Sequence, residues 1–282
     1  MTRPRLSYEV FPPADASGTA ALRDTITSLN GRGFEFVSVT YGAGGGQRDR
    51  SFAAIDMVAA LADCPVAAHL TCVGVSRTDA ESVIDTYIDL GVRHIVALRG
   101  DPPTGIDQPY VAHPDGFSST AELVAAIGDR ARARQADISV TVSAYPEVHP
   151  QSPSLDHDLD VLAAKVAAGA TQAISQMFFV PERFREYISA VRARGCGIDV
   201  VAGIMPLHPA ERIAGFAERC GAHVPPQLLE RITHSDDPRS TAIDVAVEQI
   251  HALQEHGTTR FHLYTLNRPG IVRAITERLD LS

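Results

Sequence analysis

The stretch Asp79–Leu98, DAESVIDTYIDLGVRHIVAL, contains one complete unit of the pattern that decides the fold. In its first part, apolar residues recur at intervals of three and four, as in a helix with one buried face: Val83, Ile84, Tyr87 and Ile88. Gly91 follows, at the position where helices commonly end in a left-handed residue. The run HIVAL comes next, and its apolar, partly β-branched side chains suit a strand buried on both faces.

The same unit recurs along the chain. Eight β-rich runs are expected as strands: 7–11, 34–41, 66–72, 94–98, 138–143, 172–179, 199–205 and 260–265. Amphipathic, alanine-rich segments are expected as the helices between and after them: 20–30, 51–62, 79–90, 121–134, 155–168, 182–194, 209–220 and 240–255. Several of these end in glycine: Gly31, Gly91, Gly169, Gly195 and Gly257.

Strict alternation of strand and helix implies parallel strands joined by right-handed crossovers. Eight units in this length match a closed (β/α)8 TIM barrel of the α/β class, and the alternative is an open, doubly wound sheet with extra strands. The Gly-rich turn at residues 42–46 lacks the GxGxxG order and a phosphate-loop lysine, which favours the barrel.

No composition shift marks a domain boundary, so residues 1–282 are expected to form a single catalytic domain. Two insertions interrupt the period, a Pro/Gly/Asp-rich loop at Pro102–Phe117 and an extra helix at Val224–His234. Loops this long are often functional. The segment Pro269–Leu279 is predicted to be the last helix.

Composition narrows the function classes. The chain is 45% hydrophobic and carries a net charge of −9, which argues against disorder and against a general affinity for nucleic acid. No apolar run is long enough to span a membrane, and the first residues have no signal-peptide core. Four cysteines without CxxC spacing favour a reducing, cytoplasmic location, and no zinc or iron motif is present.

Polar residues collect where the predicted strands end, which is where (β/α)8 barrels carry their chemistry. They are Glu9, Thr40, Tyr41, His69, Thr71, Arg99, Asp101, Tyr145, Glu147, His149, Gln176, Asn267 and Arg268. Each has a structural alternative: Glu9 could be salt-bridged, Asp101 could cap a turn or pair with Arg99, and His69 could be a satisfied core histidine. The joint pattern is more informative than any single member.

The strand ends resemble the methylenetetrahydrofolate reductase family. The matching segments run in order over nearly the whole chain: SYEVFPP (7–13), VTYGAGG (39–45), HLTC (69–72), ALRGD (97–101), AYPEVHP (144–150), SQMFF (175–179), GIMP (203–206) and FHLYTLNR (261–268). This resemblance implies a TIM barrel that reduces 5,10-methylenetetrahydrofolate to 5-methyltetrahydrofolate. The chain resembles the catalytic barrel alone, without the regulatory extension of eukaryotic relatives.

The resemblance also implies residue roles. Glu9 corresponds to the general acid and Asp101 to the aspartate that favours a cationic iminium. Gln176 and Arg268 correspond to folate contacts, and Tyr145 and Thr40 are expected to touch the substrate as well. Positions that contact flavin in the family correspond to Thr40, His69, Arg99, Gly100, Tyr145, His149, Asp158 and Lys165.

The match to the flavin-binding pattern is incomplete. The family usually places Tyr-Ala before the fourth helix, where this chain has Phe117-Ser118-Ser119-Thr120. It also usually places Asn and Arg between Asp158 and Lys165, where this chain has Val161 and Ala164. These departures resemble an actinobacterial subgroup that works without flavin, so we expect direct hydride transfer from NADH, preferred over NADPH, with FAD absent.

Alternatives remain at this stage. They are the same reaction through bound FAD, a related proline dehydrogenase-like barrel, and a folate-binding pseudoenzyme or regulator. No ribose-reading motif separates NADH from NADPH, and the sequence leaves monomer and homo-oligomer open. The expected partner is a small folate, with no nucleic acid and no membrane.

Overall fold

The computed structural model describes residues 3–42, 45–102, 108 and 110–281. Eight strands form a closed barrel in chain order, and every neighbouring pair is parallel. The strands are β1 (Arg5–Val10), β2 (Val37–Val39), β3 (Val66–Thr71), β4 (His94–Leu98), β5 (Ser139–Ala144), β6 (Gln172–Ser175), β7 (Asp199–Ile204) and β8 (Arg260–Tyr264). The prediction of a (β/α)8 barrel is confirmed, and the open sheet is excluded because β8 pairs with β1.

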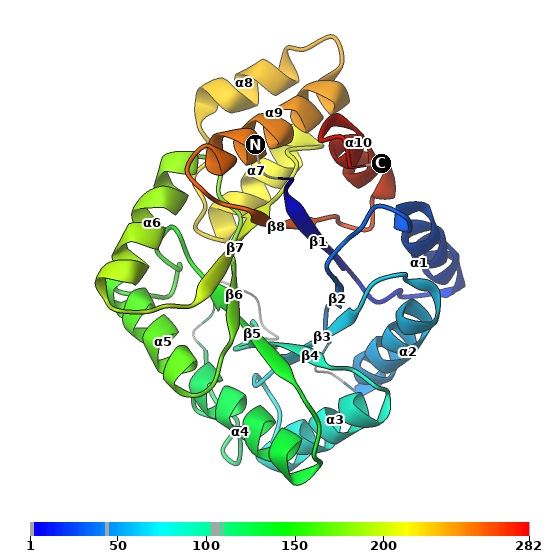
Figure 1. Cartoon of the computed structure of the whole chain (residues 1–282), viewed down its shortest axis with the longest axis vertical. Helices are drawn as coiled ribbons and strands as arrows, with labels where there is room; N and C mark the ends of the chain where they lie inside the picture. The colour runs from blue at the N-terminus through cyan, green and yellow to red at the C-terminus, as the bar shows by residue number, and fades with distance from the viewer. Residues whose placement is uncertain (1–2, 43–44, 103–107, 109, 282) are drawn as a thin grey trace.

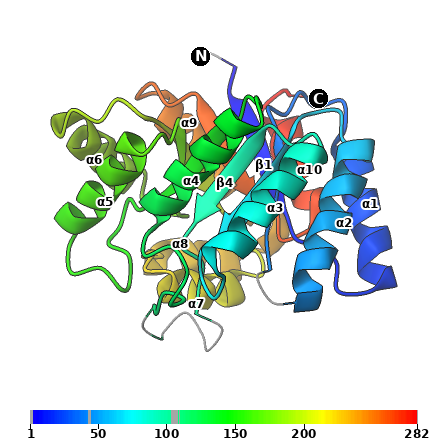
Figure 2. The ribbon, with the colours of Figure 1, turned by 90° about the horizontal axis from the view of Figure 1, so that it is seen from below.

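A ring of helices surrounds the barrel (Figure 1). The described chain contains α1 (Ala16–Leu29), α2 (Gly45–Leu61), α3 (Arg77–Asp89), α4 (Thr120–Ala133), α5 (Leu155–Ala167), α6 (Pro181–Ala193), α7 (Ala210–Arg219), α8 (Pro226–Thr233), α9 (Pro238–Gln254) and α10 (Pro269–Arg278). The helix α8 is the predicted insertion, and it packs against α7 and α9 on the outside of the ring. Both described chain ends lie at one end of the barrel, and α7 and α8 lie toward the other (Figure 2).

Local chemistry fixes several helix boundaries. The predicted first helix began at Ala20, but α1 starts one turn earlier because the Asp15 side chain accepts a hydrogen bond from the Gly18 amide. All five glycines predicted to end helices have positive φ angles, for example 80° at Gly91.

Two strands are shorter than predicted by four residues or more. The run at 34–41 pairs only over Val37–Val39, and the run at 172–179 pairs only to Ser175. Beyond Ser175 the Gln176 amide still donates to the Ala144 carbonyl, but the next amide donates to the side chain of Gln176 itself. Apolar composition therefore continued past the ends of both ladders.

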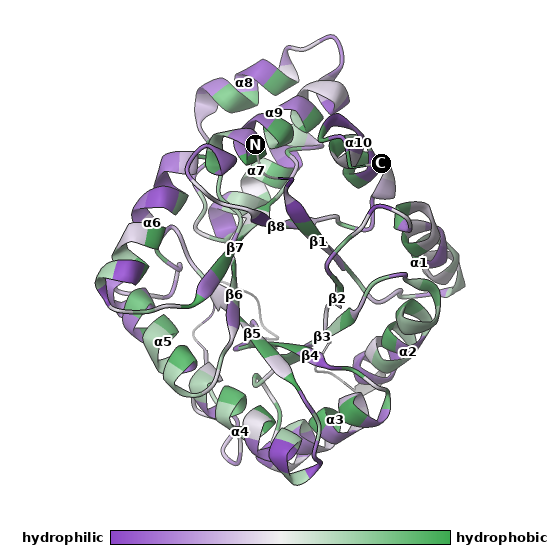
Figure 3. Ribbon diagram, in the orientation of Figure 1, coloured by the Kyte–Doolittle hydropathy of each residue, from purple (hydrophilic) through white to green (hydrophobic). Residues whose placement is uncertain are grey.

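The core lies mostly between the barrel and the helices, where green, hydrophobic faces meet (Figure 3). Inside the barrel a small apolar layer closes the centre: Phe36, Ala67, Val96, Ile174 and Val201. Val96 and Ile174 of this layer line the cavity that opens at the carboxyl ends of the strands.

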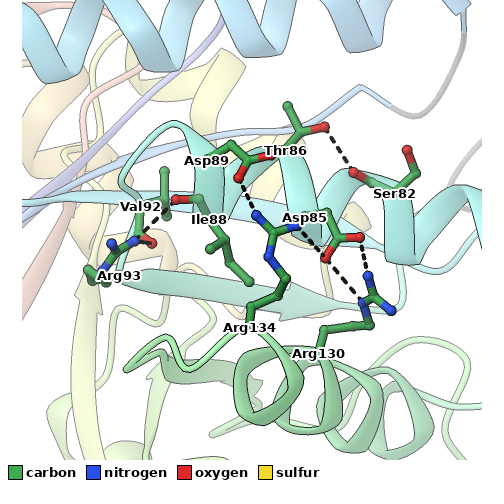
Figure 4. Close-up of polar contacts among 9 residues, drawn as sticks. All are labelled: Ser82, Asp85, Thr86, Ile88, Asp89, Val92, Arg93, Arg130 and Arg134. Atoms are coloured by element: carbon green, nitrogen blue, oxygen red, sulfur yellow. Dashed lines mark hydrogen bonds and ion pairs between the residues drawn. The ribbon is translucent and has the colours of Figure 1, made fainter.

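Ion pairs join neighbouring helices on the outside. Arg130 of α4 and Arg134, which caps the end of α4, both contact Asp85 of α3, and Arg134 also contacts Asp89 (Figure 4). Because these pairs are partly solvent-exposed, each contributes modestly, on the order of 0–1 kcal/mol. No described helix has the length and apolar character needed to cross a bilayer.

Candidate active site

A cavity of about 360 Å³ opens at the carboxyl ends of the strands. Its wall includes most of the polar strand-end residues singled out in the sequence: Glu9, Thr40, Tyr41, His69, Thr71, Arg99, Asp101, Tyr145, His149 and Gln176, together with Gly100. This volume falls within the range of small-molecule sites. The barrel topology thus brings together residues that are up to 167 positions apart, from Glu9 to Gln176.

Glu9 points into this cavity from β1. Its neighbours Tyr8 and Val10 face the opposite way and are fully buried under the helices, since side chains alternate along a strand. The Glu9 side chain is only 12% exposed, and its Oε2 lies 3.6 Å from Nε2 of His69 on β3. Burial raises the pKa of Glu9 to about 8 and lowers the pKa of His69 to about 3. Near neutral pH the pair is therefore a carboxylic acid and a neutral imidazole rather than an ion pair.

The turn after β4 presents Arg99 and Asp101 to the cavity. Gly100 between them has φ of 82°, and a Cβ there would lie 2.5 Å from Cγ1 of Val73, so only glycine fits. The Arg99 guanidinium lies 5.0 Å from the centre of the Tyr110 ring, in a cation–π contact. Residues 103–107 and 109 of the predicted long loop lie outside the described part of the chain.

Tyr145 and His149 form the wall above β5, and their rings meet edge to face at 4.7 Å. Asp158 and Lys165 of α5 do not line the cavity. The Asp158 carboxylate accepts the His149 amide at 2.9 Å, and Lys165 Nζ donates to the Ser143 carbonyl and hydroxyl at 3.0 and 3.2 Å. Both side chains are therefore hydrogen-bonded to other parts of the protein, outside the cavity.

Gln176 lines the cavity, whereas Arg268 does not. Arg268 donates from Nη1 to the His208 carbonyl at 2.9 Å and borders a separate small recess with Leu266. The Asn267 side chain accepts the Phe11 amide and donates to the Phe11 carbonyl, so it fixes the start of the loop between β1 and α1. Glu147 accepts the His223 amide. Proximity in sequence to a strand end did not bring these three side chains into the cavity.

Sequence reasoning missed other lining residues. They are Phe11, Val96, Leu98, Val142, Ser143, Ile174, Met177, Met205, Phe216, His262, Tyr264 and Leu266. A period-two reading of β8 would have found His262 and Tyr264, because they flank the outward-facing, fully buried Leu263. No local signal identifies Phe216, which reaches the cavity from α7.

The model of the methylenetetrahydrofolate reductase family matches residues 2–280. The 5,10-methylenetetrahydrofolate reductase of Escherichia coli K12 is 32% identical over 280 residues, covering 98% of this chain and 90% of that protein. The chain belongs to the methylenetetrahydrofolate reductase family. It is accordingly an oxidoreductase, as the resemblance of the strand ends implied.

Other relatives extend this result. The 5,10-methylenetetrahydrofolate reductase of Pectobacterium carotovorum is 34% identical, over 99% of this chain and 91% of that protein. Methylenetetrahydrofolate reductase (NADH) 1 of Arabidopsis thaliana is 32% identical, over 93% of this chain but 46% of that protein.

Solved structures with a similar fold include an oxaloacetate acetylhydrolase in complex with oxalate, with TM-score 0.58, 13% identity and coverage of 98% of this chain and 80% of that one. Dihydropteroate synthase from Thermus thermophilus has TM-score 0.53 at 12% identity, over 99% of this chain and 93% of that one. At such identities the likeness concerns the fold alone.

The reductase family implies a flavin, and the geometry of this chain fits one only in part. Thr40, His69, Arg99, Tyr145 and His149 line the cavity, but Asp158 and Lys165 are bonded to the protein itself. Val161 and Ala164 on α5 are exposed and offer no polar atoms for ribose or phosphate. The described residues therefore do not form a complete dinucleotide cradle beside α5.

Among the described residues, no group of three or more His, Cys, Asp and Glu side chains is arranged to hold a metal ion.

Proposed function

We propose that this reductase converts 5,10-methylenetetrahydrofolate to 5-methyltetrahydrofolate with a hydride from NADH. One observation carries the proposal: a buried carboxyl, Glu9, in the cavity wall with a pKa raised to about 8. Such a group holds a proton at neutral pH and can release it to a basic atom within the site. The names of the bacterial relatives supply the substrate class.

The chemistry requires one proton and one hydride. Glu9 protonates N10 of the folate, the bond between N10 and the methylene carbon breaks, and N5 and that carbon become an iminium cation. The hydride from C4 of the reduced nicotinamide then adds to the methylene carbon and gives the N5 methyl group. Folate is reduced, the nicotinamide is oxidised, and the Glu9 carboxylate recovers its proton from water.

We infer that Asp101 favours the cation. It borders the same cavity as Glu9, and a carboxylate near a developing positive charge lowers the energy of the iminium. Gln176 also borders this cavity, where its amide can hydrogen-bond the pteridine edge. Tyr145 and Thr40, which also line the cavity, are proposed as further substrate contacts. Arg268 would have to release the His208 carbonyl before it could bind a folate carboxylate.

We further propose that the hydride passes directly between nicotinamide and folate in a ternary complex, without FAD. Two observations support this. Asp158 and Lys165 are already hydrogen-bonded to His149 and Ser143, and Val161 and Ala164 expose only apolar side chains on α5. Losing two charged or polar contacts of about 1.5–3 kcal/mol each would weaken a dinucleotide by roughly 10²–10⁴-fold. A cytoplasmic location is proposed on the four free cysteines.

Spectra and rate assays of the purified protein test both the proposed reaction and the proposed absence of FAD. We expect no absorbance near 450 nm and NADH oxidation that depends on methylenetetrahydrofolate and does not increase with added FAD. Initial-rate plots should intersect, since both substrates bind before either product leaves. Stoichiometric FAD or parallel lines would replace direct transfer with a flavin shuttle, and binding of folate without turnover would identify a pseudoenzyme.

A further inference from the structure

The carboxyl group of Glu9 has one close polar side-chain neighbour in the described part of the chain. That neighbour is His69, whose Nε2 lies 3.6 Å from Oε2, slightly beyond hydrogen-bond distance, and has no hydrogen-bond partner although it is buried. A buried polar atom without a partner costs free energy of about 1–3 kcal/mol. Two polar groups that each lack another protein partner thus face each other in the wall of the cavity.

The His69 ring is held firmly. Its side chain is 8% exposed, and it faces inward from β3 between Ala68 and Leu70, which are fully buried on the outer face. Its carbonyl accepts a hydrogen bond of 2.7 Å from the Tyr87 hydroxyl of α3. The backbone of His69 is fixed in this way, so its buried ring has little freedom to turn away from the carboxyl that it faces.

The surroundings of Glu9 decide its charge state. The strand β8 presents Tyr264 and His262, and β2 and the residue after it present Ser38 and Thr40, none of which is charged near neutral pH. Arg99 and Asp101 border the same cavity from the end of β4 with opposite charges. Desolvation therefore dominates at Glu9, and the imidazole that faces it is neutral.

We propose that His69 is a positioning residue that donates its Nε2 hydrogen to Oε2 of Glu9 and thereby leaves the transferable proton on Oε1. This inference rests on the proposed role of Glu9 as proton donor. A carboxylic acid that accepts at one oxygen carries its own proton on the other, so the contact sets the direction of proton release. After transfer, the same hydrogen bond stabilises the carboxylate.

The test compares His69→Leu, which removes the donor, with His69→Gln, which places an amide N–H near the Nε2 position. For His69→Leu we expect kcat to fall roughly tenfold or more with little change in KM. The basic limb of the kcat–pH profile should move up by about one pH unit, because the carboxylate loses its hydrogen bond. His69→Gln should restore most of the turnover and return the limb toward its original position.

A second readout does not depend on turnover. The Glu9 pKa can be followed by ¹³C NMR of glutamate-labelled protein without substrates, and it should rise in His69→Leu and recover in His69→Gln. A downward shift, an unchanged pKa or a glutamine variant as impaired as the leucine variant would each overturn the assignment. If the wild type lacks reductase activity but its Glu9 pKa still responds as expected, the proposed function fails and the hydrogen bond stands. Circular dichroism and thermal unfolding verify that both variants fold.

Discussion

At the scale of single residues, the main feature is a carboxyl group inside a strand whose flanking side chains are apolar. Tyr8 and Val10 face the core, while Glu9 faces the cavity and is largely shielded from water. The fold accepts this residue because the acid is neutral when it is buried. The shielding that is costly for a carboxylate is what makes Glu9 suitable as a proton donor.

Replacing Glu9 with Gln should lower kcat by roughly 10²-fold or more, because the amide fills the same space and has no transferable proton. Folding should be preserved, since the native side chain is already neutral at pH 7. Steady-state assays at saturating substrate measure the effect. Glu147→Gln is the matched control, because Glu147 follows β5 but lies outside the cavity, and it should retain turnover.

The pH dependence of stability gives an independent check on Glu9. Its pKa is about 8 in the folded protein and about 4.5 in a free chain, so the folded state keeps a proton that the unfolded state releases. Stability relative to Glu9→Gln should therefore fall as pH rises from about 4.5 to above 8, and this loss should level off beyond. Urea unfolding of both proteins across this range of pH measures it, and parallel pH curves would contradict the raised pKa.

At the scale of elements, the contact between β6, β7 and β8 shapes the cavity wall. The Tyr264 hydroxyl donates to the Ser175 carbonyl at 2.7 Å, and Gly203 on β7 leaves the space that this ring occupies. A Cβ on Gly203 would lie 2.2 Å from that carbonyl oxygen and 2.8 Å from the Tyr264 ring. The glycine of the GIMP segment is therefore required for packing rather than for a turn.

Gly203→Ala should destabilise the protein by about 1–3 kcal/mol or more, because the backbone oxygen cannot move aside without breaking the ladder. The control is Gly197→Ala just before β7, where an added Cβ meets nothing within 4 Å. That change should be neutral or stabilising by up to about 1 kcal/mol. Denaturant unfolding of the two variants makes the comparison, and equal free energies of unfolding would refute the packing argument.

The helix α5 carries the surface on which our proposal of a flavin-free site rests. Val161 and Ala164 are both exposed there, whereas Lys165 points inward to Ser143. A helix with this pattern offers an apolar surface beside the cavity wall. On our proposal, Val161 and Ala164 therefore give ribose and phosphate no polar side chain to bind.

Placing Asn and Arg at these positions, as Val161→Asn with Ala164→Arg, should raise FAD affinity by roughly 10-fold or more, since each new contact to a charged group contributes about 1.5–3 kcal/mol when formed. Fluorescence quenching of added FAD measures binding. Ala167→Arg adds the same charge about one turn away on α5, at another exposed position, and should leave affinity unchanged. If the wild type, the double variant and Ala167→Arg all bound FAD with the same affinity, the structural basis proposed for a flavin-free site would be wrong.

At the scale of the whole molecule, the barrel closes between β8 and β1, with Glu9 opposite Tyr264 in the register. At the other end of this seam, Arg260 donates to Glu35 at 2.8 Å and to Asp199 at 2.7 Å, and Glu35 also pairs with Arg5. The Arg260 side chain is 18% exposed, and it joins β8 to β7 through Asp199 and to Glu35, which precedes β2 and in turn pairs with Arg5 of β1. Closure therefore depends on charged residues as well as on the ladder.

Arg260→Met should lower the free energy of unfolding by about 2 kcal/mol, because two hydrogen-bonded carboxylates lose their shared partner. Arg132→Met provides the comparison. Arg132 pairs with Asp129 on the exposed face of α4, and its loss should cost no more than about 0.5 kcal/mol. Urea titrations of the two variants at low salt make the comparison. If their unfolding midpoints coincided, the proposed contribution of Arg260 to the closure between β8 and β1 would be wrong.

The sequence by itself determined eight alternating strand–helix units with parallel strands, because the strand–helix–glycine period is a local property of each segment. It left an open sheet as the alternative to the barrel, and the pairing of β8 with β1 excludes that sheet. It also determined that the polar strand ends meet, since Glu9, His69, Arg99, Asp101, Tyr145 and Gln176 all follow from strand order. Where the strands end was less predictable, because apolar composition at 34–36 and 176–179 continues beyond the ladders.

Only the tertiary structure decided which strand-end side chains reach the cavity. Arg268 follows β8 but donates to the His208 carbonyl, and Asp158 and Lys165 of α5 bond to the His149 amide and to Ser143 of β5, contacts that depend on how these segments pack. The same reason applies to Tyr264 and Phe216, which enter the cavity through the geometry of β8 and α7. The protonation of Glu9 likewise depends on how completely other strands exclude water from it, which is a property of the closed barrel.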